Sequence, residues 1–547
     1  YNLMTFSQRQ TFHQAVAGWY EQTFEEDISP YYGVLAYHWK NARNSQKTME
    51  YLEKAGEQAM FNFANPEAIE FFEEALQLVN NNDVKVSPLR QAHWERQLAE
   101  AHYGLGDLPK CRQHLQRSVQ LLGGKTPEQG MGLVTGLLSD LARQVQFRIK
   151  PKPILETALP SYLEETEQAK KLEGAQALVR LGHVYYQMNK PIPLVVSTLQ
   201  AVNLAERAGV KSPVLARCYT NMCIVSGILP RHDWAWAYRN RAHEVGRSAN
   251  DLPSLSYAIA GCGTYEIGAV LWKNAVEDFR ESMEIDERIG DMRHYDEAKS
   301  LLSIVLFHQG EYQFGWETAD EVQERAIRRK DIMPQVWSHT LRAEILLRQS
   351  RQGTLQQALD EYERSLSLLE QNIDLASQIR SQGALALVYW RSGDMARALD
   401  LAAATAKMTA GNPTAPYSIE GYAGAAEVFL NAWQNGDTKY RNDAAKACKS
   451  LKKFAGVYPI GQPRLKLYSG LFDWLDGKPE KAQIQWQAAL EDAGRLNMPY
   501  EQGRAYLYLG QHILKGAEKN NALVCARQIF NQLGVQYEAK KVGMLIG

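Results

Sequence analysis

The chemistry that this sequence comes closest to is phosphate binding by a glycine-rich loop. Gly123-Gly124-Lys125-Thr126 matches the second half of the P-loop pattern, in which backbone amides cradle a phosphate and the lysine neutralises it. The first glycine of that pattern would stand at position 119, which is Val119, and a helical pattern rather than a strand precedes it. Two Gly-x-Gly pairs, at 104–106 and 261–263, lack the third glycine of a dinucleotide-binding loop. We therefore expect no nucleotide cofactor.

The histidines, cysteines and serines also form no recognisable catalytic or metal-binding motif. The 12 histidines include no HExxH pattern, and single ones such as His38, His183 and His308 fit helix packing better than metal ligation. The 6 cysteines form no CxxC pair, which fits reduced, buried thiols. GxSxG is missing, and no cysteine has a histidine partner at a motif spacing. We predict no catalytic residue, no metal site and no cofactor, so the chain is not expected to be an enzyme.

Composition and charge describe an ordinary folded chain. Of its 547 residues 45% are hydrophobic and 22% are charged, and the formal net charge is -1. This balance gives no reason to expect nucleic acid as a partner, and the basic runs at 325–330 and 446–453 fit solvated helix faces. No signal-peptide layout and no bilayer-length apolar run is present. We expect no membrane insertion and a cytoplasmic location.

A recurrent spacing of mostly small side chains predicts paired helices. A small residue is followed by three further positions at intervals of 12, 4 and 3 residues, and the third position is often bulky. Two antiparallel helices approach closely only where side chains are small, and residues 4 and 7 apart share one face of a helix. The copies are Gly56/Ala68/Phe72/Ala75, Ala99/Cys111/Leu115/Ser118, Gly263/Ala275/Phe279/Ser282, Ser303/Gly315/Ala319/Val322, Ala386/Ala398/Ala402/Thr405, Gly470/Ala482/Trp486/Ala489 and Gly510/Ala522/Ala526/Ile529.

Turn residues recur about every 41 positions, close to the signature's own turns. They centre on residues 65, 106, 150, 190, 230, 272, 310, 350, 393, 436, 477 and 516. The period predicts about twelve helical hairpins in an all-α, tetratricopeptide (TPR)-like α-solenoid with a right-handed superhelix. We expect an N-terminal helix and link over residues 1–30 and the repeat array over 31–547, with a possible bend near 123–130.

A solenoid of this kind offers a concave groove lined by the first helix of each pair. Buried aromatic residues and arginines are the usual energetic centres of protein interfaces. By their register in the repeats, the groove candidates are Tyr103, Tyr219, Tyr265, Arg342, Arg380, Trp390 and Arg391. The expected occupant is a protein partner or peptide.

Both ends of the chain resemble the C-terminal helical region of a multidomain family, the soluble adenylyl cyclase-like proteins and related signal-transducing ATPases. The similarity lies in residues 1–24, 35–39 (LAYHW), 51–76, 458–464 (YPIGQPR), 496–512 and 526–534 (ARQIFNQLG). In that family an effector such as a class III cyclase and an ATPase precede the array. Neither the cyclase's metal-binding aspartates nor a P-loop is present in this sequence, so no catalytic residue is carried over.

Two functions remain open from the sequence. The first is a non-catalytic scaffold that mediates protein–protein interaction and regulates a cyclase/ATPase signalling module. The alternative is a small-molecule-sensing superhelical domain of a signal-transducing ATPase. A homo-oligomer is possible in either case, and the chain itself could be a piece of a longer protein, since it begins at Tyr1 without a methionine.

Overall fold

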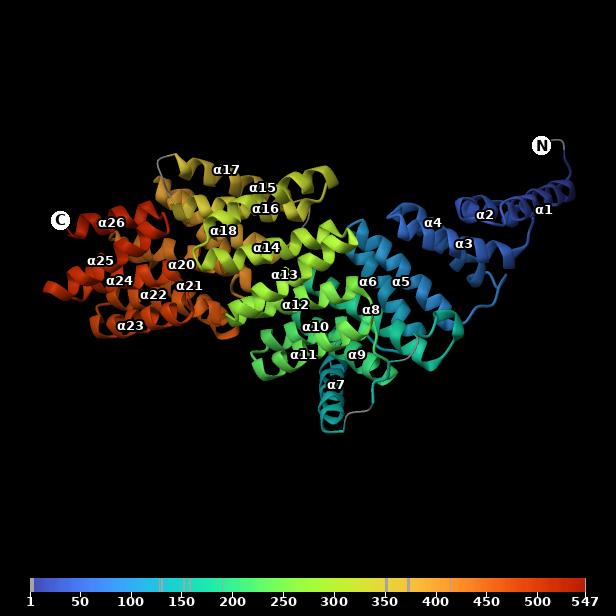
Figure 1. The fold of residues 1–547 in the computed structure, drawn as a ribbon, viewed down its shortest axis with the longest axis horizontal. Coiled ribbons are helices and arrows are strands. Elements are labelled where there is room, and N and C mark those ends of the chain that lie inside the picture. The colour runs from blue at the N-terminus through green and yellow to red at the C-terminus, as the bar shows by residue number, and fades with distance from the viewer. Residues whose placement is uncertain are drawn as a thin grey trace. The chain divides into compact units, whose positions relative to one another are not determined.

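The computed structural model describes residues 4–126, 128, 131–150, 153–156, 159–188, 190–349, 353–370, 374–413 and 415–546. The chain divides into two compact units, Tyr1–Cys218 and Tyr219–Gly547, with the boundary inside one helix. All regular elements of the described residues are helical, apart from one isolated bridge between Leu155 and Val210 (Figure 1). We describe each unit by itself.

The first unit contains the helices up to the boundary. They are α1 (Phe6–Thr23), η1 (Ser29–Tyr31), α2 (Tyr32–Asn41), α3 (Ser45–Phe61), α4 (Asn65–Asn80), α5 (Pro88–Gly104), α6 (Leu108–Leu121), α7 (Met131–Ile149), η2 (Tyr162–Glu164), α8 (Glu167–Gln187), α9 (Pro191–Ala208) and α10 (Pro213–Ile228), in which the boundary falls.

The second unit contains the remaining helices. They are α11 (His232–Ser248), α12 (Leu252–Ala269), α13 (Trp272–Ile289), α14 (Met292–His308), α15 (Tyr312–Arg329), α16 (Ile332–Gln349), α17 (Thr354–Leu369), α18 (Leu375–Ser392), α19 (Met395–Met408), η3 (Pro416–Ser418), α20 (Ile419–Gln434), η4 (Thr438–Tyr440), α21 (Arg441–Val457), η5 (Pro459–Gly461), α22 (Gln462–Leu475), α23 (Pro479–Arg495), α24 (Pro499–His512), α25 (Gly516–Gln532) and α26 (Gln536–Ile546).

The expected turns separate pairs of helices, which confirms the all-α, TPR-like fold of consecutive hairpins. Glycine in the left-handed region ends the first helix, and an aspartate then caps the second. Gly393 has φ +93°, for example, and the Asp394 carboxylate accepts a hydrogen bond from the Arg397 amide at 3.1 Å. Gly106 and Asp107 repeat this arrangement at the turn between α5 and α6.

The spaced small residues lie where the two helices of a pair touch. A Cβ added to Gly56 would stand 2.7 Å from the Phe72 ring, and one added to Gly470 would stand 2.5 Å from Trp486. Each large ring fills the space that a glycine leaves on the opposing helix, so Phe72 and Trp486 are fully buried. The signature therefore predicted these contacts correctly.

The hairpin expected at residues 149–151 is wrong. α7 ends at Ile149, and the next helix, η2, begins only at Tyr162. We call residues 150–166 the α7–α8 link; residues 151, 152, 157 and 158 lie outside the described part. The reason is local, because Pro153 and Pro160 remove backbone donors and disfavour helix in the residues before them. The bend expected near 123–130 also lies partly outside the described residues.

In the second unit, hairpins far apart in sequence touch one another. A Cβ on Gly268 of α12 would stand 2.7 Å from Tyr458, and the Trp272 indole donates to the Leu496 carbonyl at 2.6 Å. A simple solenoid repeat contacts only its neighbours. The second unit is therefore more closed than the open array expected from the sequence.

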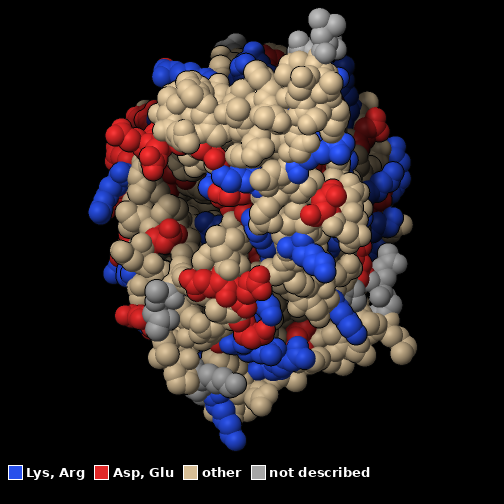
Figure 2. Space-filling model, turned by 90° about the vertical axis from the view of Figure 1, so that its right-hand side faces the viewer, with Lys and Arg blue, Asp and Glu red and all other residues tan. Residues whose placement is uncertain are grey.

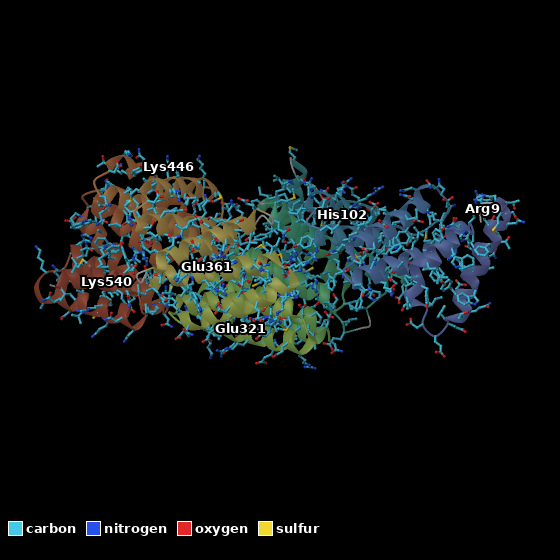
Figure 3. The ribbon with its side chains drawn as sticks, turned by 90° about the horizontal axis from the view of Figure 1, so that it is seen from above. Arg9, His102, Glu321, Glu361, Lys446 and Lys540 are labelled. Carbon is cyan, nitrogen blue, oxygen red and sulfur yellow. The ribbon has the colours of Figure 1, made fainter. Side chains whose placement is uncertain are left out.

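The charged residues on the second helices mostly pair with the adjoining first helix. Glu321 and Glu361, labelled in Figure 3, come from α15 and α17. Glu321 accepts from Lys299 at 2.5 Å, and Glu361 lies 2.6 Å from the His339 ring nitrogen. These pairs add to the apolar contacts that close each hairpin.

The closest approach of two backbones in the second unit yields a test of the packing. A Cβ on Gly421 of α20 would stand 2.0 Å from the Ile379 carbonyl oxygen of α18, which side-chain movement cannot relieve. We expect Gly421→Ala to lower the free energy of unfolding by about 3 kcal/mol. The measurement is denaturant unfolding of the full chain.

Gly456 is the matched control, because it is an exposed residue of α21 with no atom within 4 Å of an added Cβ. Gly456→Ala should raise the free energy of unfolding by up to about 1 kcal/mol through helix propensity. Equal effects of the two alanines would contradict the packing account.

Candidate functional site

The first helices of the first unit hold an aromatic side chain from the α7–α8 link. The Tyr162 ring stacks on the His93 imidazole, with ring centroids 3.8 Å apart and planes 5° apart. Its hydroxyl donates to the Glu57 carboxylate at 2.6 Å and lies 3.3 Å from Glu53. Burial and the two carboxylates raise the pKa of Tyr162 well above its usual value, so the phenol stays a hydrogen-bond donor. We call this site the tyrosine socket.

Two neighbouring first helices build the socket. Glu53 and Glu57 are four residues apart on α3, and therefore on one face of that helix, while His93 comes from α5. The ring of Tyr162 is half-buried, whereas its neighbours Ser161, Leu163 and Glu164 are exposed. One aromatic residue, the first of the short 3-10 helix η2 in an otherwise mostly exposed link, thus provides the contact.

Further charged residues fix the walls of the socket. Glu53 accepts from Arg90 at 2.5 Å and from the Trp94 indole at 2.7 Å. Below His93, the buried Glu173 of α8 accepts from Arg96 at 2.5 Å. Burial alone would raise the pKa of Glu173, but Arg96 and His93 lower it to about 2. The Arg96 pair holds the Glu173 carboxylate ionised, and the hydrogen bonds from Arg90 and Trp94 orient the Glu53 carboxylate.

The repeat period did not reveal the socket, because it predicts a hairpin turn near residue 150 with helices on both sides. The sequence does contain a signal for an interrupted helix, since Pro153 and Pro160 precede Tyr162 in the link. The link is also attached at a second place. Leu155 donates to the Gly209 carbonyl at 2.9 Å and accepts from the Lys211 amide at 2.9 Å.

The first helices of the second unit enclose a balanced set of charges instead of an open groove. Five arginines and five glutamates lie there with side chains that are almost fully buried: Arg348, Arg380, Arg391, Arg464, Arg504, Glu344, Glu420, Glu427, Glu501 and Glu538. They come from α16, α18, α20, α22, α24 and α26. We call them the charged core.

Each arginine of the charged core meets a glutamate from another helix. Arg348 donates to Glu420 at 2.7 Å, and Arg464 donates to Glu501 at 2.6 Å. Arg504 donates to Glu427 at 2.7 Å. Tyrosines complete the contacts: Tyr468 donates to Glu427 at 2.5 Å, and Tyr500 donates to Glu538 at 2.7 Å.

The pKa shifts agree with a structural role for the charged core. Burial would raise the pKa of Glu420, but Arg348 and Arg464 lower it to about 2, and Arg504 lowers the pKa of Glu427 in the same way. Burial lowers the pKa of the neighbouring His308 to about 4, so this histidine is neutral at pH 7.

Two of the seven groove candidates, Arg380 and Arg391, belong to the charged core. Arg380 binds Glu344 through two hydrogen bonds of 2.7 and 2.6 Å, and Arg391 binds Glu538 at 2.9 Å. Trp390 is half-buried against the hydrophobic core, and Arg342 pairs with Asp320 at 2.5 Å. These contacts lie within the unit and do not support a role in a partner groove.

The three tyrosine candidates also lie on first helices. Tyr219 and Tyr265 are 2% and 7% exposed, so neither offers a ring to a partner. Tyr103 of α5 is half-buried and accessible, and Arg180 of α8 covers one side of its ring at 4.3 Å from the centroid. Tyr103 is thus the candidate that best fits a partner-facing position, on the same helix as His93.

One cysteine of the second unit has a histidine neighbour that the sequence did not predict. Cys262 of α12 lies beside Cys223 and His243, and His243 lies 3.3 Å from Asp278. Burial would raise the pKa of Cys262, but these two neighbours lower it to about 6. Both cysteines are 0% exposed, and a catalytic cysteine must be reached by its substrate. This group gives no support to catalysis.

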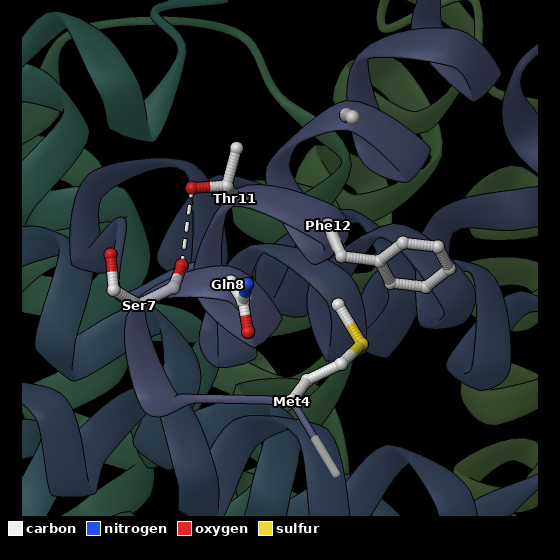
Figure 4. A pocket seen from close by; sticks show the side chains of 6 residues that line it. Met4, Ser7, Gln8, Thr11 and Phe12 are labelled. Carbon is white, nitrogen blue, oxygen red and sulfur yellow. Dashed lines mark hydrogen bonds between the residues drawn. The ribbon is translucent and has the colours of Figure 1, made fainter. Parts of the chain in front are cut away.

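A shallow hollow along α1 is lined by Met4, Ser7, Gln8, Thr11, Phe12 and Ala15 and carries no charged residue (Figure 4). On the face shown in Figure 2, basic and acidic side chains are interspersed rather than gathered by sign.

Among the described residues no group of histidine, cysteine or carboxylate side chains has metal-binding geometry. No described helix has the length and hydropathy needed to cross a bilayer.

Comparisons with known proteins give no assignment of family. No protein-family model and no curated protein matches the chain. Among solved structures, the Cut9–Hcn1 hetero-tetramer of APC/C is 12% identical, covers 91% of this chain and 95% of that chain, and has a TM-score of 0.34. Yeast Tom70 is 13% identical, covers 98% and 99%, and has a TM-score of 0.25. At these values neither likeness carries a functional argument.

The charged core yields a test of its structural role. Arg504→Met leaves the buried carboxylate of Glu427 without its nearest guanidinium group. Removing one partner of a buried ion pair costs about 3–5 kcal/mol. We expect a loss of this size in denaturant unfolding, and faster amide hydrogen exchange in α20.

Arg441 provides the control, since its pair with Asp476 at 2.7 Å lies at the surface, with 49% of the arginine and 13% of the aspartate side chain accessible, and Lys478 also pairs with Asp476. Arg441→Met should cost less than about 1 kcal/mol. If Arg504→Met lowered the free energy of unfolding by no more than Arg441→Met does, the charged core would not hold the second unit together.

Proposed function

We propose that this chain is a protein-interaction scaffold whose first unit binds a peptide segment across α3, α5 and α8. The observation that carries this proposal is the position of Tyr162. This residue of the α7–α8 link binds His93 and Glu57 as a residue of a separate peptide would. Aromatic side chains that stack on another ring and also form a buried hydrogen bond are typical anchors of protein interfaces. The nearby Tyr103 extends the same face along α5.

The chemistry of the socket defines the partner's anchor. The His93 ring selects a flat aromatic side chain, and the Glu57 carboxylate selects one that carries a hydroxyl donor. A phosphorylated tyrosine would be rejected, since its charge would face Glu57 and Glu53. The preferred partner therefore presents an unmodified tyrosine in a short turn or loop, as the link does.

A labelled peptide with the sequence of residues 159–166, LPSYLEET, tests the proposal. The wild-type link competes with it at an effective concentration that is about millimolar for a short tether. We expect the Tyr162→Ala chain, whose socket is vacant, to bind the peptide with a dissociation constant on the order of 100 μM. Wild-type chain should bind at least about tenfold more weakly. Fluorescence anisotropy gives both values.

Three controls distinguish binding of the peptide in the tyrosine socket from non-specific binding elsewhere on the chain. Glu57→Gln or His93→Ala in the Tyr162→Ala background should abolish binding, because each removes a contact to the ring or hydroxyl. A peptide with alanine in place of its tyrosine should not bind. Leu163 is an exposed neighbour of Tyr162, 59% accessible. The Leu163→Ala chain should therefore bind the peptide as weakly as the wild-type chain does. Equal binding of the peptide to wild-type and Tyr162→Ala chains would contradict the proposal.

We further propose that the scaffold regulates a cyclase or ATPase module, on the strength of the resemblance of both chain ends to such proteins. The socket supplies the means, since a partner segment would displace Tyr162. Adding the Tyr162→Ala chain to a purified module of that family should change its nucleotide turnover more than wild-type chain does. Identical turnover with either chain, and without any, would contradict this regulatory role.

The alternative, small-molecule sensing, gains no support from the described interior of the second unit, which the charged core fills.

A further inference from the structure

Four side chains of the first unit converge on one carboxylate, that of Glu128. Arg112 and Gln116, four residues apart on one face of α6, donate to it at 3.3 and 2.6 Å. The Tyr185 hydroxyl of α8 donates to it at 3.1 Å, and the ammonium group of Lys190, which precedes α9, donates at 3.4 Å. We call Arg112, Gln116, Tyr185 and Lys190 the anion site.

The anion site carries more positive charge than Glu128 neutralises. Arg112 and Lys190 are both cations, and in the described part of the chain Glu128 is the only carboxylate that pairs with either of them. Their contacts to it, at 3.3 and 3.4 Å, are also long. Hydrogen bonds between a charged nitrogen donor and a carboxylate are typically about 2.7–2.9 Å. A singly charged carboxylate thus satisfies the site only in part.

The anion site also has a donor that Glu128 does not use. One oxygen of Glu128 accepts from Gln116 and Tyr185, and the other accepts from Arg112 and Lys190. Arg112 Nε is buried and has no hydrogen-bond partner among the described residues. A buried polar group without a partner indicates that a binding partner is missing. A ligand with a third acceptor oxygen would supply it.

We propose that the anion site binds a phosphoryl group, as inorganic phosphate or as a phosphate monoester. Such a group carries a charge of about −1.5 to −2 at pH 7 and has three acceptor oxygens. Its charge matches the two cations, Arg112 and Lys190. Its oxygens have enough lone pairs for all five donor atoms of the site, the unused Arg112 Nε included.

A small ligand can reach the anion site from solvent. The side chains of Arg112 and Lys190 are 27% and 31% exposed, and that of Glu128 is 21% exposed. Rotation of the Glu128 side chain about its own bonds therefore suffices to vacate the site. Tyr185 lies deeper, and burial together with Glu128 raises the pKa of its hydroxyl, which stays a donor. Because these donors are side chains, the site is not a P-loop, in which backbone amides cradle the phosphate.

The inference goes beyond the proposed peptide binding and does not rest on it. The anion site shares no residue with the tyrosine socket, and it lies on α6, α8 and the turn before α9 instead of on α3 and α5. Failure of the phosphate experiment below would leave the peptide experiment unaffected, and the reverse is also true.

Titration of the full chain with inorganic phosphate, followed by phosphorus NMR, tests the proposal. In the Glu128→Ala chain the anion site is vacant, and we expect a dissociation constant on the order of 1 mM. Wild-type chain should bind at least about tenfold more weakly, because Glu128 competes from within the same chain. Acetate should bind the Glu128→Ala chain at least about tenfold more weakly than phosphate does, since it has one charge and two oxygens.

Two further substitutions in the Glu128→Ala background locate the bound phosphate. Arg112→Gln removes a charge and the unused donor, and it should weaken phosphate binding at least about tenfold. Lys110→Gln is the matched control, because Lys110 is a cation of the same helix, 61% exposed, that pairs with Asp107. This control should bind phosphate as the Glu128→Ala chain does. Unchanged far-ultraviolet circular dichroism would show that the variants are folded.

A second ligand distinguishes the two sources of the phosphoryl group. If N-acetyl-phosphoserine amide binds the Glu128→Ala chain more tightly than inorganic phosphate does, the ligand is a phosphate monoester; the reverse order identifies the free ion. The proposal is overturned if neither ligand binds this chain with a dissociation constant below about 10 mM. Equal binding to the Arg112→Gln and Lys110→Gln variants would also overturn it, as would acetate binding as tight as that of phosphate.

Discussion

The approach of helices at places where only a glycine or another small side chain fits is the constraint on which this fold depends. Gly56 and Gly470 each leave room for a ring from the opposing helix of the hairpin, and Gly421 lets two first helices touch through their backbones. Close approach fixes the rotation of each helix about its own axis. That rotation decides which residues of the first helices point toward the interior of a unit, and so it determines where binding surfaces can form.

The two units use this inward face in different ways. In the second unit the first helices come close enough to bury ten charged side chains as matched pairs, which excludes solvent from the interior that the described residues enclose. Buried pairs contribute little net stability but penalise any arrangement that leaves a charge unmatched. In the first unit the corresponding face takes up Tyr162 from the link, between His93 and Glu57. The same repeat thus gives a charge-filled interior in one unit and, in the other, a face that holds an aromatic side chain of the link.

The pairing of helices could be predicted from the sequence, whereas the site could not. The 12, 4, 3 spacing identified Gly56 with Phe72 and Gly470 with Trp486, because both members lie within one hairpin. The charged core joins residues such as Arg391 and Glu538, which are 147 positions apart, and no local pattern signals such a contact. The socket was missed for a different reason: a regular period suggested a hairpin where Pro153 and Pro160 favour an irregular link. Arg380 and Arg391 were placed on the correct helices, but their inward direction leads to glutamates of the same unit.

The central claim is that Tyr162 occupies a preformed site on α3 and α5, and the environment of its ring tests this most directly. Fluorine NMR of the full chain with 3-fluorotyrosine at position 162 reports stacking on His93 and the hydrogen bond to Glu57. The account predicts a resonance displaced from that of free fluorotyrosine, which returns to the free position in a Glu57→Gln/His93→Ala chain. A narrow wild-type resonance at the free position would contradict it.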